Sequence, residues 1–237
     1  MNVNTDDLAP CGLPAFMEQT EEIVHFLQGL SYGEAKKLWA CNDRIAEQNY
    51  DRLQQMDLYH QLTPAILSYE GIAYQYMAPS VFENGQFAYV QEHLRILSAF
   101  YGVVRPMDGV TPYRLEMQTK AKIAGTKDLY DYWGDRLYRE VLDDSRVIIN
   151  LASKEYSRCI EKYLQPEDVY ITCVFGEFSG EKIVQKGVYA KMARGEMERF
   201  MAENRIGSPE EMKGFDRLGY GFRADLSDEK TYIFIKK

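Results

Sequence analysis

Two arginines lie in a short segment that is otherwise apolar and rigid. Arg105 and Arg114 fall within residues 93–117, and Pro106 and Pro112 stand close by. A proline pushes the residue before it into extended or turn geometry, so the two prolines fix where the arginines point. A planar guanidinium binds two phosphate oxygens at once. The segment therefore predicts a surface that is held in place to present positive charge.

The backbone before Arg105 is predicted to be helical. Leu94, Leu97 and Tyr101 recur at i, i+3 and i+7, which is the spacing of one apolar helix face. Gly102 then stands where a helix commonly ends in a left-handed residue. We expect a helix that ends at Gly102 and leads into the Arg105 turn.

The first third of the chain is predicted to be helical as well. Residues 15–27 carry apolar side chains at helical spacing, and Gly29 follows them. Asn42 is a suitable N-cap for a further helix that runs to about Gln55.

The turn at Gly29-Leu30-Ser31 imitates the hairpin of a helix-hairpin-helix motif. Such a turn binds DNA because its backbone N–H groups and the start of the next helix face a phosphate. Ser31 stands where that motif prefers a second glycine, and Lys36 follows on the next helix. The alternative is an ordinary corner between two helices with a solvated Lys36.

The second half mixes helices and strands. Asp128 is expected to cap a helix over residues 129–141, in which Trp133 anchors the core. Residues 147–149 form a β-branched apolar run, which predicts a buried strand that ends at Asn150.

Two hairpins and a long helix complete the expected elements. The hairpins pair residues 169–175 with 182–188 and residues 220–223 with 231–235. The helix covers about residues 190–206, with Lys191 and Arg194 on a cationic edge beside an apolar face. Glu198 lies four residues after Arg194, so a solvated ion pair is the alternative to a binding role. Together these elements predict an α+β fold with a mixed sheet.

Four sequence blocks resemble the YaaA family of bacterial peroxide stress proteins. The blocks are Tyr101-Gly-Val-Val-Arg-Pro-Met-Asp108 with Pro112-Tyr-Arg-Leu-Glu-Met117, residues 127–135, residues 150–156, and Tyr189-Ala-Lys-Met-Ala-Arg-Gly-Glu-Met197. The resemblance implies a cytoplasmic DNA-binding protein that limits damage from peroxide and free iron. Two departures stand out: the family's opening strand and its Ser-Pro-Ala-Lys segment are not found near Met1, and Met192 replaces a lysine.

The resemblance selects the expected DNA contacts from the cations of these blocks. The predicted phosphate-binding residues, with the turn donors added, are Arg105, Arg114, Lys127, Lys154, Lys191, Arg194, Gly29, Ser31 and Lys36. We expect them to bind duplex or distorted DNA in a basic cleft. Four tyrosines of the same blocks are candidates to stack on unpaired bases, or else they fill the core: Tyr101, Tyr113, Tyr156 and Tyr189.

Composition limits which DNA sites, domain organisation, cofactors and cellular locations are expected. The net charge of −8 means that any DNA site must be local, because nucleic acid partners demand a basic surface. No linker or repeat divides the 237 residues, so we expect one domain, most simply a monomer. The four cysteines and three histidines lack metal-ligand spacing, so no metal or cofactor is predicted. The absence of a signal pattern or an apolar span predicts a cytoplasmic location.

Two other functions stay open. A phosphate-handling enzyme would gather polar groups of one cleft around its substrate, namely Asp135, Asn150, Ser153, Lys154 and Glu155. Weak Fe(II) binding by the carboxylates of Glu116 and Asp135 is the third possibility.

Overall fold

The computed structural model describes residues 1–3 and 8–237, which fold into two compact units. The first unit is built from Met1–Ser68, Arg95–Val141 and Ala152–Tyr163. The second is built from Tyr69–Leu94, Leu142–Leu151 and Leu164–Lys237. The expectation of a single domain stays a prediction. The expected lack of an opening strand falls partly on residues 4–7, which lie outside the described residues.

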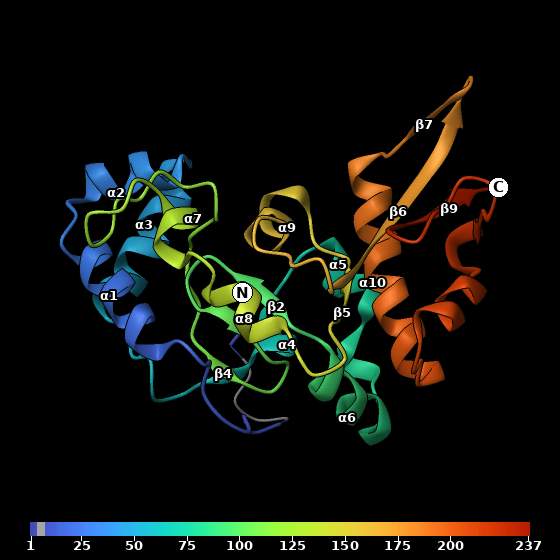
Figure 1. The fold of residues 1–237 in the computed structure, drawn as a ribbon. Helices are drawn as coiled ribbons and strands as arrows, with labels where there is room; N and C mark the ends of the chain where they lie inside the picture. Colours follow the sequence, from blue (N-terminus) through green and yellow to red (C-terminus); the bar gives the residue numbers. More distant parts are fainter. Residues whose placement is uncertain (4–7) are drawn as a thin grey trace. The chain divides into compact units, whose positions relative to one another are not determined.

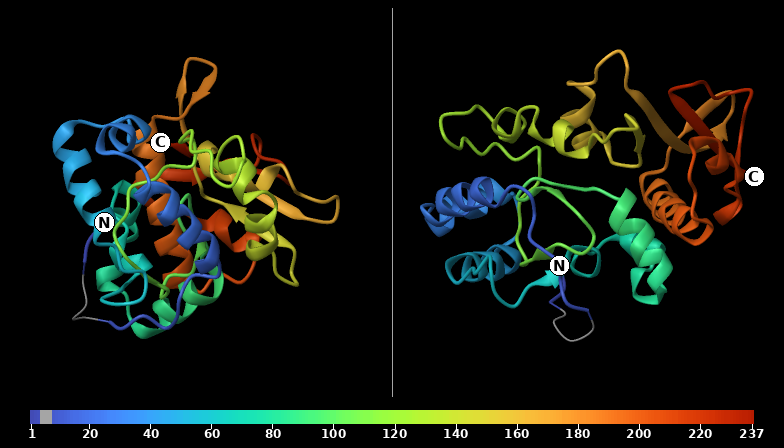
Figure 2. Two further views of the ribbon diagram at one scale, coloured as in Figure 1. Left: turned by 90° about the vertical axis from the view of Figure 1, so that its left-hand side faces the viewer. Right: turned by 60° about the horizontal axis from the view of Figure 1, so that its bottom comes forward.

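Helices dominate the start of the first unit. They are α1 (Met17–Gln28), α2 (Tyr32–Trp39), α3 (Asp43–Gln54) and α4 (Ala65–Ser68). Both views of Figure 2 place α1, α2 and α3 beside one another. Asn42 caps α3 as predicted, because its Oδ1 accepts a hydrogen bond from the Ile45 amide at 3.0 Å.

The predicted helix over residues 94–101 is wrong. The chain instead forms the antiparallel pair β2 (Ile96–Ser98) and β3 (Gly102–Val104), joined by a tight turn. Gly102 has a φ of 75°, so its left-handed conformation serves this turn instead of a helix end. A Cβ on Gly102 would lie 2.8 Å from the Trp133 ring, which explains why glycine is required there.

The expected helix over residues 129–141 is two helices. They are α7 (Leu129–Trp133) and α8 (Arg136–Val141). Gly134, with a φ of 57°, interrupts the helix between them. Asp128 caps α7 as predicted, and Trp133 is fully buried with its Nε1 donating to the Ala99 carbonyl at 2.9 Å. The remaining elements of this unit are β1 (Thr63–Pro64), β4 (Gly109–Val110) and α9 (Lys154–Glu161), with β1 and β4 paired antiparallel.

A mixed sheet forms the centre of the second unit. Its strands are β5 (Val147–Asn150), β6 (Val169–Ser179), β7 (Lys182–Val184), β8 (Tyr220–Phe222) and β9 (Thr231–Lys236). The order is β5-β6-β9-β8, with β5, β6 and β9 parallel and β8 antiparallel, and β7 pairs with the far end of β6. The predicted hairpin of residues 220–223 with 231–235 is confirmed as β8 with β9. The other predicted hairpin is wrong in its pairing: residues 177–179 pair with β7, because β6 continues past Gly176, and residues 169–175 pair with β5 and β9 instead. β5 is an edge strand whose first three residues are half-buried, so the expectation that it is buried is wrong.

One face of this sheet packs against α10 (Gly187–Asn204). The core between them holds an aromatic cluster in which Phe175 contacts Phe215, Tyr220 and Phe234 at centroid distances of 5.2–5.8 Å. The remaining helices of the unit are α5 (Ile72–Met77), η1 (Pro79–Val81), α6 (Asn84–His93), η2 (Pro209–Gly214) and η3 (Arg217–Gly219). Figure 1 shows the β6–β7 hairpin extending beyond the other strands of its sheet.

Gly195 lets α10 cross α5 at very short range. A Cβ on Gly195 would lie 2.0 Å from the Ala73 carbonyl oxygen, which is far inside van der Waals contact. The predicted α+β class is confirmed by these two units. Of the helices in the described part of the chain, none is both long and apolar enough to cross a membrane.

Candidate nucleic-acid interface

Arg105 is the exposed member of a buried segment. Every other residue from Tyr101 to Val110 is buried, and Arg105 alone in that run is exposed. Among the described residues it makes no ion pair with a carboxylate. The fold therefore keeps one guanidinium in water on an otherwise packed stretch of backbone.

Backbone hydrogen bonds hold the Arg105 turn from two sides. The Arg105 amide donates to Oδ2 of the buried Asp108 at 2.8 Å, and the Asp108 amide donates back to the Arg105 carbonyl at 3.0 Å. The Cys11 and Ile66 amides donate to the carbonyls of Met107 and Pro106 at 2.8 and 2.9 Å. Burial raises the pKa of Asp108, and the charge of Arg105 opposes that rise. The turn is thus fixed before any ligand binds.

Three of the four motif tyrosines are structural. Tyr101 is fully buried, and its hydroxyl accepts a hydrogen bond from the Thr111 amide at 3.0 Å. The Tyr113 ring stacks on Phe100 at 4.5 Å, and burial raises the pKa of half-buried Tyr156. These three side chains place the segment that carries Arg114, so the core-filling alternative holds for them.

The segments that carry Arg114, Lys127 and Lys154 meet at Glu155 of α9. The Glu155 carboxylate accepts a hydrogen bond from the Gln118 amide at 3.1 Å, and its carbonyl accepts one from the Tyr130 hydroxyl at 2.9 Å. The first of these contacts brings the Arg114 segment to α9, which begins at Lys154. The second brings α7, which Lys127 precedes.

The three cations differ in how far they are already engaged. Lys127 is exposed and makes no ion pair among the described residues. Lys154 pairs with Glu161 at 2.6 Å, and a half-buried Arg114 lies 3.6 Å from Glu116. The Arg114 Nε atom is buried without a hydrogen-bond partner. Lys127 is therefore the most available of the three for a phosphate.

The backbone N–H groups of the α1–α2 turn already donate hydrogen bonds within the protein. The Gly29 and Leu30 amides donate to the carbonyls of His25 and Leu27 at 3.1 Å each. The Ser31 amide donates to the Glu34 carboxylate at 2.8 Å, as part of a capping box. A negative carboxylate thus occupies the place that a phosphate would take.

Lys36 is also engaged within the protein. Its Nζ lies 2.5 Å from the Asp43 carboxylate, which also accepts a hydrogen bond from Tyr32. This geometry matches the ordinary helix corner that was the alternative. The DNA-binding role of Gly29, Ser31 and Lys36 stays a prediction, and it requires the Glu34 and Asp43 contacts to open.

The two predicted cations of α10 lie in different surroundings in the second unit. Lys191 is exposed, whereas Arg194 is half-buried and its Nε atom is buried without a hydrogen-bond partner. Burial lowers the pKa of Arg194, and the nearby Glu198 carboxylate opposes this. Burial in turn raises the pKa of Glu198 to about 8. A basic cleft that joins these cations to those of the first unit stays a prediction.

Tyr189 is the one exposed motif tyrosine, and its neighbours were missed by the sequence reasoning. The Lys236 and Lys186 ammonium groups lie 4.4 and 5.9 Å from the centre of its ring. Lys236 is at the end of β9, 47 positions along the chain from Tyr189, so no local pattern links the two. Only the contacts of α10 with the sheet bring them together.

Four of the five residues of the enzyme alternative contact another group of the protein through their side chains, namely Asp135, Asn150, Lys154 and Glu155. Asp135 pairs with Arg139 at 2.5 Å, and the Asn150 amide donates to the Thr172 hydroxyl at 3.2 Å. Ser153 begins α9 at its N-cap. Nowhere in residues 1–3 and 8–237 do three histidine, cysteine or acidic side chains gather as metal ligands. Catalysis and iron binding stay predictions.

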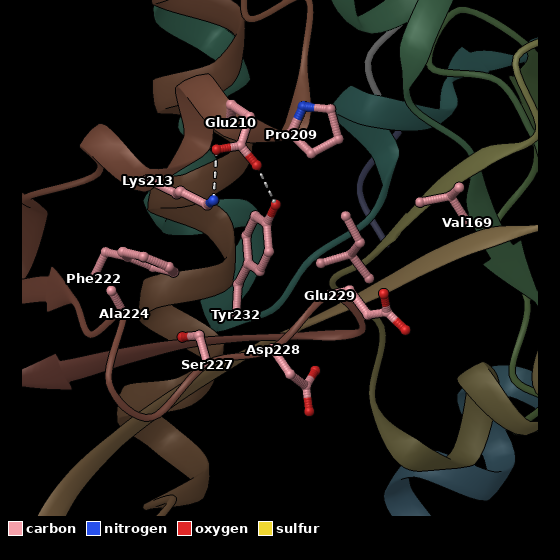
Figure 3. A pocket seen from close by; sticks show the side chains of 11 residues that line it. Val169, Pro209, Glu210, Lys213, Phe222, Ala224, Ser227, Asp228, Glu229 and Tyr232 are labelled. Atoms are coloured by element: carbon pink, nitrogen blue, oxygen red, sulfur yellow. Dashed lines mark hydrogen bonds and ion pairs between the residues drawn. The ribbon is translucent and has the colours of Figure 1, made fainter.

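A pocket of about 500 Å³ opens in the second unit, and its charged rim is acidic (Figure 3). Tyr232 and Lys213 both contact Glu210, so the charge of the pocket's lysine is already balanced at 2.5 Å. Asp228 and Glu229 add two further carboxylates. The negative rim makes this pocket unsuitable for phosphate.

The geometry so far defines an α+β protein that presents isolated cations on a rigid scaffold. Its sequence matches the family described as peroxide stress protein YaaA over residues 2–226. A UPF0246 protein of Agathobacter rectalis is 64% identical over 237 residues, covering 100% of this chain and 95% of the relative. A UPF0246 protein of Lachnoclostridium phytofermentans is 53% identical over 233 residues, covering 98% and 91%. This chain belongs to the YaaA family, as its motifs predicted, and the family's name is consistent with a role in peroxide stress.

Proposed function

We propose that this protein binds DNA by phosphate contacts from exposed cations on rigid backbone and so protects the cell during peroxide stress. The observation that carries the proposal is the Arg105 turn, where one guanidinium is exposed from a run of buried residues. Because the backbone of this turn is already fixed, only the side chain of Arg105 loses conformational entropy when it binds a phosphate.

The proposal ranks the predicted contacts by availability. Arg105, Lys127 and Lys191 are exposed and unpaired among the described residues, so they make the primary contacts. Arg114 and Lys154 must first exchange a carboxylate for a phosphate. Such exchange costs little at the surface, because exposed ion pairs are worth only about 0–1 kcal/mol.

The contacts proposed here do not read base sequence. Phosphate contacts fix position and orientation but carry no sequence information. We therefore expect similar affinity for duplexes of different sequence, and a steep dependence on salt because each neutralised phosphate releases counterions.

The test is the affinity of the whole chain for two plain duplexes of unrelated sequence, measured by fluorescence anisotropy across a salt series. We expect equal affinities and a log–log slope that steepens by about 0.9 for each phosphate that these cations contact. The absence of binding at low salt would reject the proposal. A mixture of labelled duplex and nucleotides, analysed for products, tests the phosphate-handling enzyme in parallel.

A further inference from the structure

Three aromatic rings stand out as exposed in the described chain. Tyr59, Phe178 and Tyr189 expose 49%, 47% and 40% of their surface. Single exposed apolar side chains are ordinary in proteins, so exposure alone implies no function. The three rings differ in the charged groups that surround them.

The rings of the second unit both lie under cations. Tyr189, in the first turn of α10, has the Lys236 ammonium 4.4 Å from its ring centre. Phe178, near the end of β6, has the Arg223 guanidinium 5.6 Å from its ring centre. Both distances fall within the roughly 6 Å range of cation–π attraction. Tyr59, in contrast, hydrogen-bonds to the Glu21 carboxylate.

The cation beside Tyr189 is not neutralised by the protein. Lys186, the second ammonium near this ring, pairs with Glu177 of β6. Lys236 has no carboxylate within ion-pair distance among the described residues. The surface at Tyr189 therefore combines an accessible ring with one unbalanced positive charge.

An accessible ring beside a cation matches one chemical partner best. Unpaired bases stack on aromatic side chains, and the phosphates that connect them attract nearby cations. The bases of an intact duplex are stacked on one another, so the ring has no free base face to contact. An acidic peptide would use the cations but leave the rings without a partner.

We infer that Tyr189 with Lys236 binds single-stranded nucleic acid. The ring stacks on an unpaired base, and the cation binds a phosphate beside it. This inference rests on the proposed DNA-binding function and adds a second contact surface that selects unpaired strands. The exposed β6–β7 hairpin beside α10 carries Phe178 (Figure 1). The Arg223 guanidinium beside Phe178 is already paired with Asp225 at 2.6 Å, so that ring is not part of the inferred site.

The test compares the affinities of the full chain and its Tyr189→Leu variant for three probes at one salt concentration. The probes are an oligothymidine strand, an abasic strand of equal length, and a plain duplex. We expect Tyr189→Leu to weaken oligothymidine binding about tenfold and to leave the other two unchanged, because only oligothymidine offers a base to stack. Tyr189→Phe should bind like the parent chain, and Tyr59→Leu is the matched control that should change nothing.

Each other outcome overturns the inference. An equal loss on the abasic strand means that the ring supports a phosphate contact and stacks on no base. Unchanged oligothymidine binding removes Tyr189 from the site while duplex binding keeps the proposed function intact. Failure of the parent chain to bind any probe rejects the proposed function itself. The last outcome uses polyglutamate as a competitor of oligothymidine. If it competes fully on the parent chain and equally well on Tyr189→Leu, the surface is an acidic-peptide site.

Discussion

Arg105 and Arg194 both lie in sequence blocks shared with the family, but their environments are opposite. Arg105 is exposed on a turn whose other residues are buried, and Asp108 fixes that turn through its backbone. Arg194 is half-buried beside Glu198, on a helix that presses against α5 at Gly195. We therefore propose that Arg105 serves a ligand, whereas Arg194 serves the packing of the protein. The predictions below test this division.

The largest effect is expected from filling the α10–α5 crossing. Gly195→Ala places a Cβ 2.0 Å from the Ala73 carbonyl oxygen, so one helix must shift. We expect a loss of about 3 kcal/mol in the free energy of unfolding, which is the upper range for overpacking. Urea denaturation measures it. Gly187→Ala is the matched control on the same helix, because nothing lies within 4 Å of that site.

Near-parental stability of Gly195→Ala would show that the two helices separate easily. The half-buried state of Arg194 would then not depend on tight packing.

A smaller loss in the free energy of unfolding is expected when the buried Asp108 carboxylate is removed from the Arg105 turn. Asp108→Ala leaves the partly buried Arg105 amide without its acceptor, which costs about 1–2 kcal/mol. The same variant should weaken duplex binding, because the backbone that carries Arg105 is no longer held in place. Denaturation and anisotropy measure the two effects. A variant that loses stability but binds the duplex unchanged would show that Arg105 needs no fixed turn.

Glu198 should make stability depend on pH. Burial raises its pKa from 4.5 to about 8, so between these values the native state holds a proton that the unfolded state has released. The free energy of unfolding should therefore fall as pH rises through this window. Glu198→Gln should remove much of that fall, whereas Glu181→Gln, on the exposed β6–β7 turn, should leave it intact. Identical pH profiles for the parent chain and Glu198→Gln would contradict the raised pKa of Glu198.

Local signals in the sequence predicted much of the fold. The caps at Asn42 and Asp128 depend on hydrogen bonds within four residues, so the sequence alone reveals them. The strands of the second unit are rich in β-branched and aromatic residues, which favour strands. The β2–β3 pair was misread because its apolar spacing also fits one helix face, and Gly102 suits a helix end as well as the turn that joins the two strands.

The candidate site was less predictable, because accessibility depends on tertiary packing. The sequence singled out Arg105 correctly as a charge held by rigid backbone. It could not show that Glu34 occupies the α1–α2 turn or that Arg194 is half-buried. Lys236 carried no signal, since only the folded sheet brings it to Tyr189.

The most direct test of the account measures duplex affinity against salt for the parent chain, Arg105→Ala and Arg194→Ala. We expect Arg105→Ala to weaken binding about threefold to tenfold and to flatten the log–log salt slope by about one unit, with stability unchanged. Arg194→Ala should change stability and leave the slope as it is. A flattened slope for Arg194→Ala with an unchanged slope for Arg105→Ala would contradict the account.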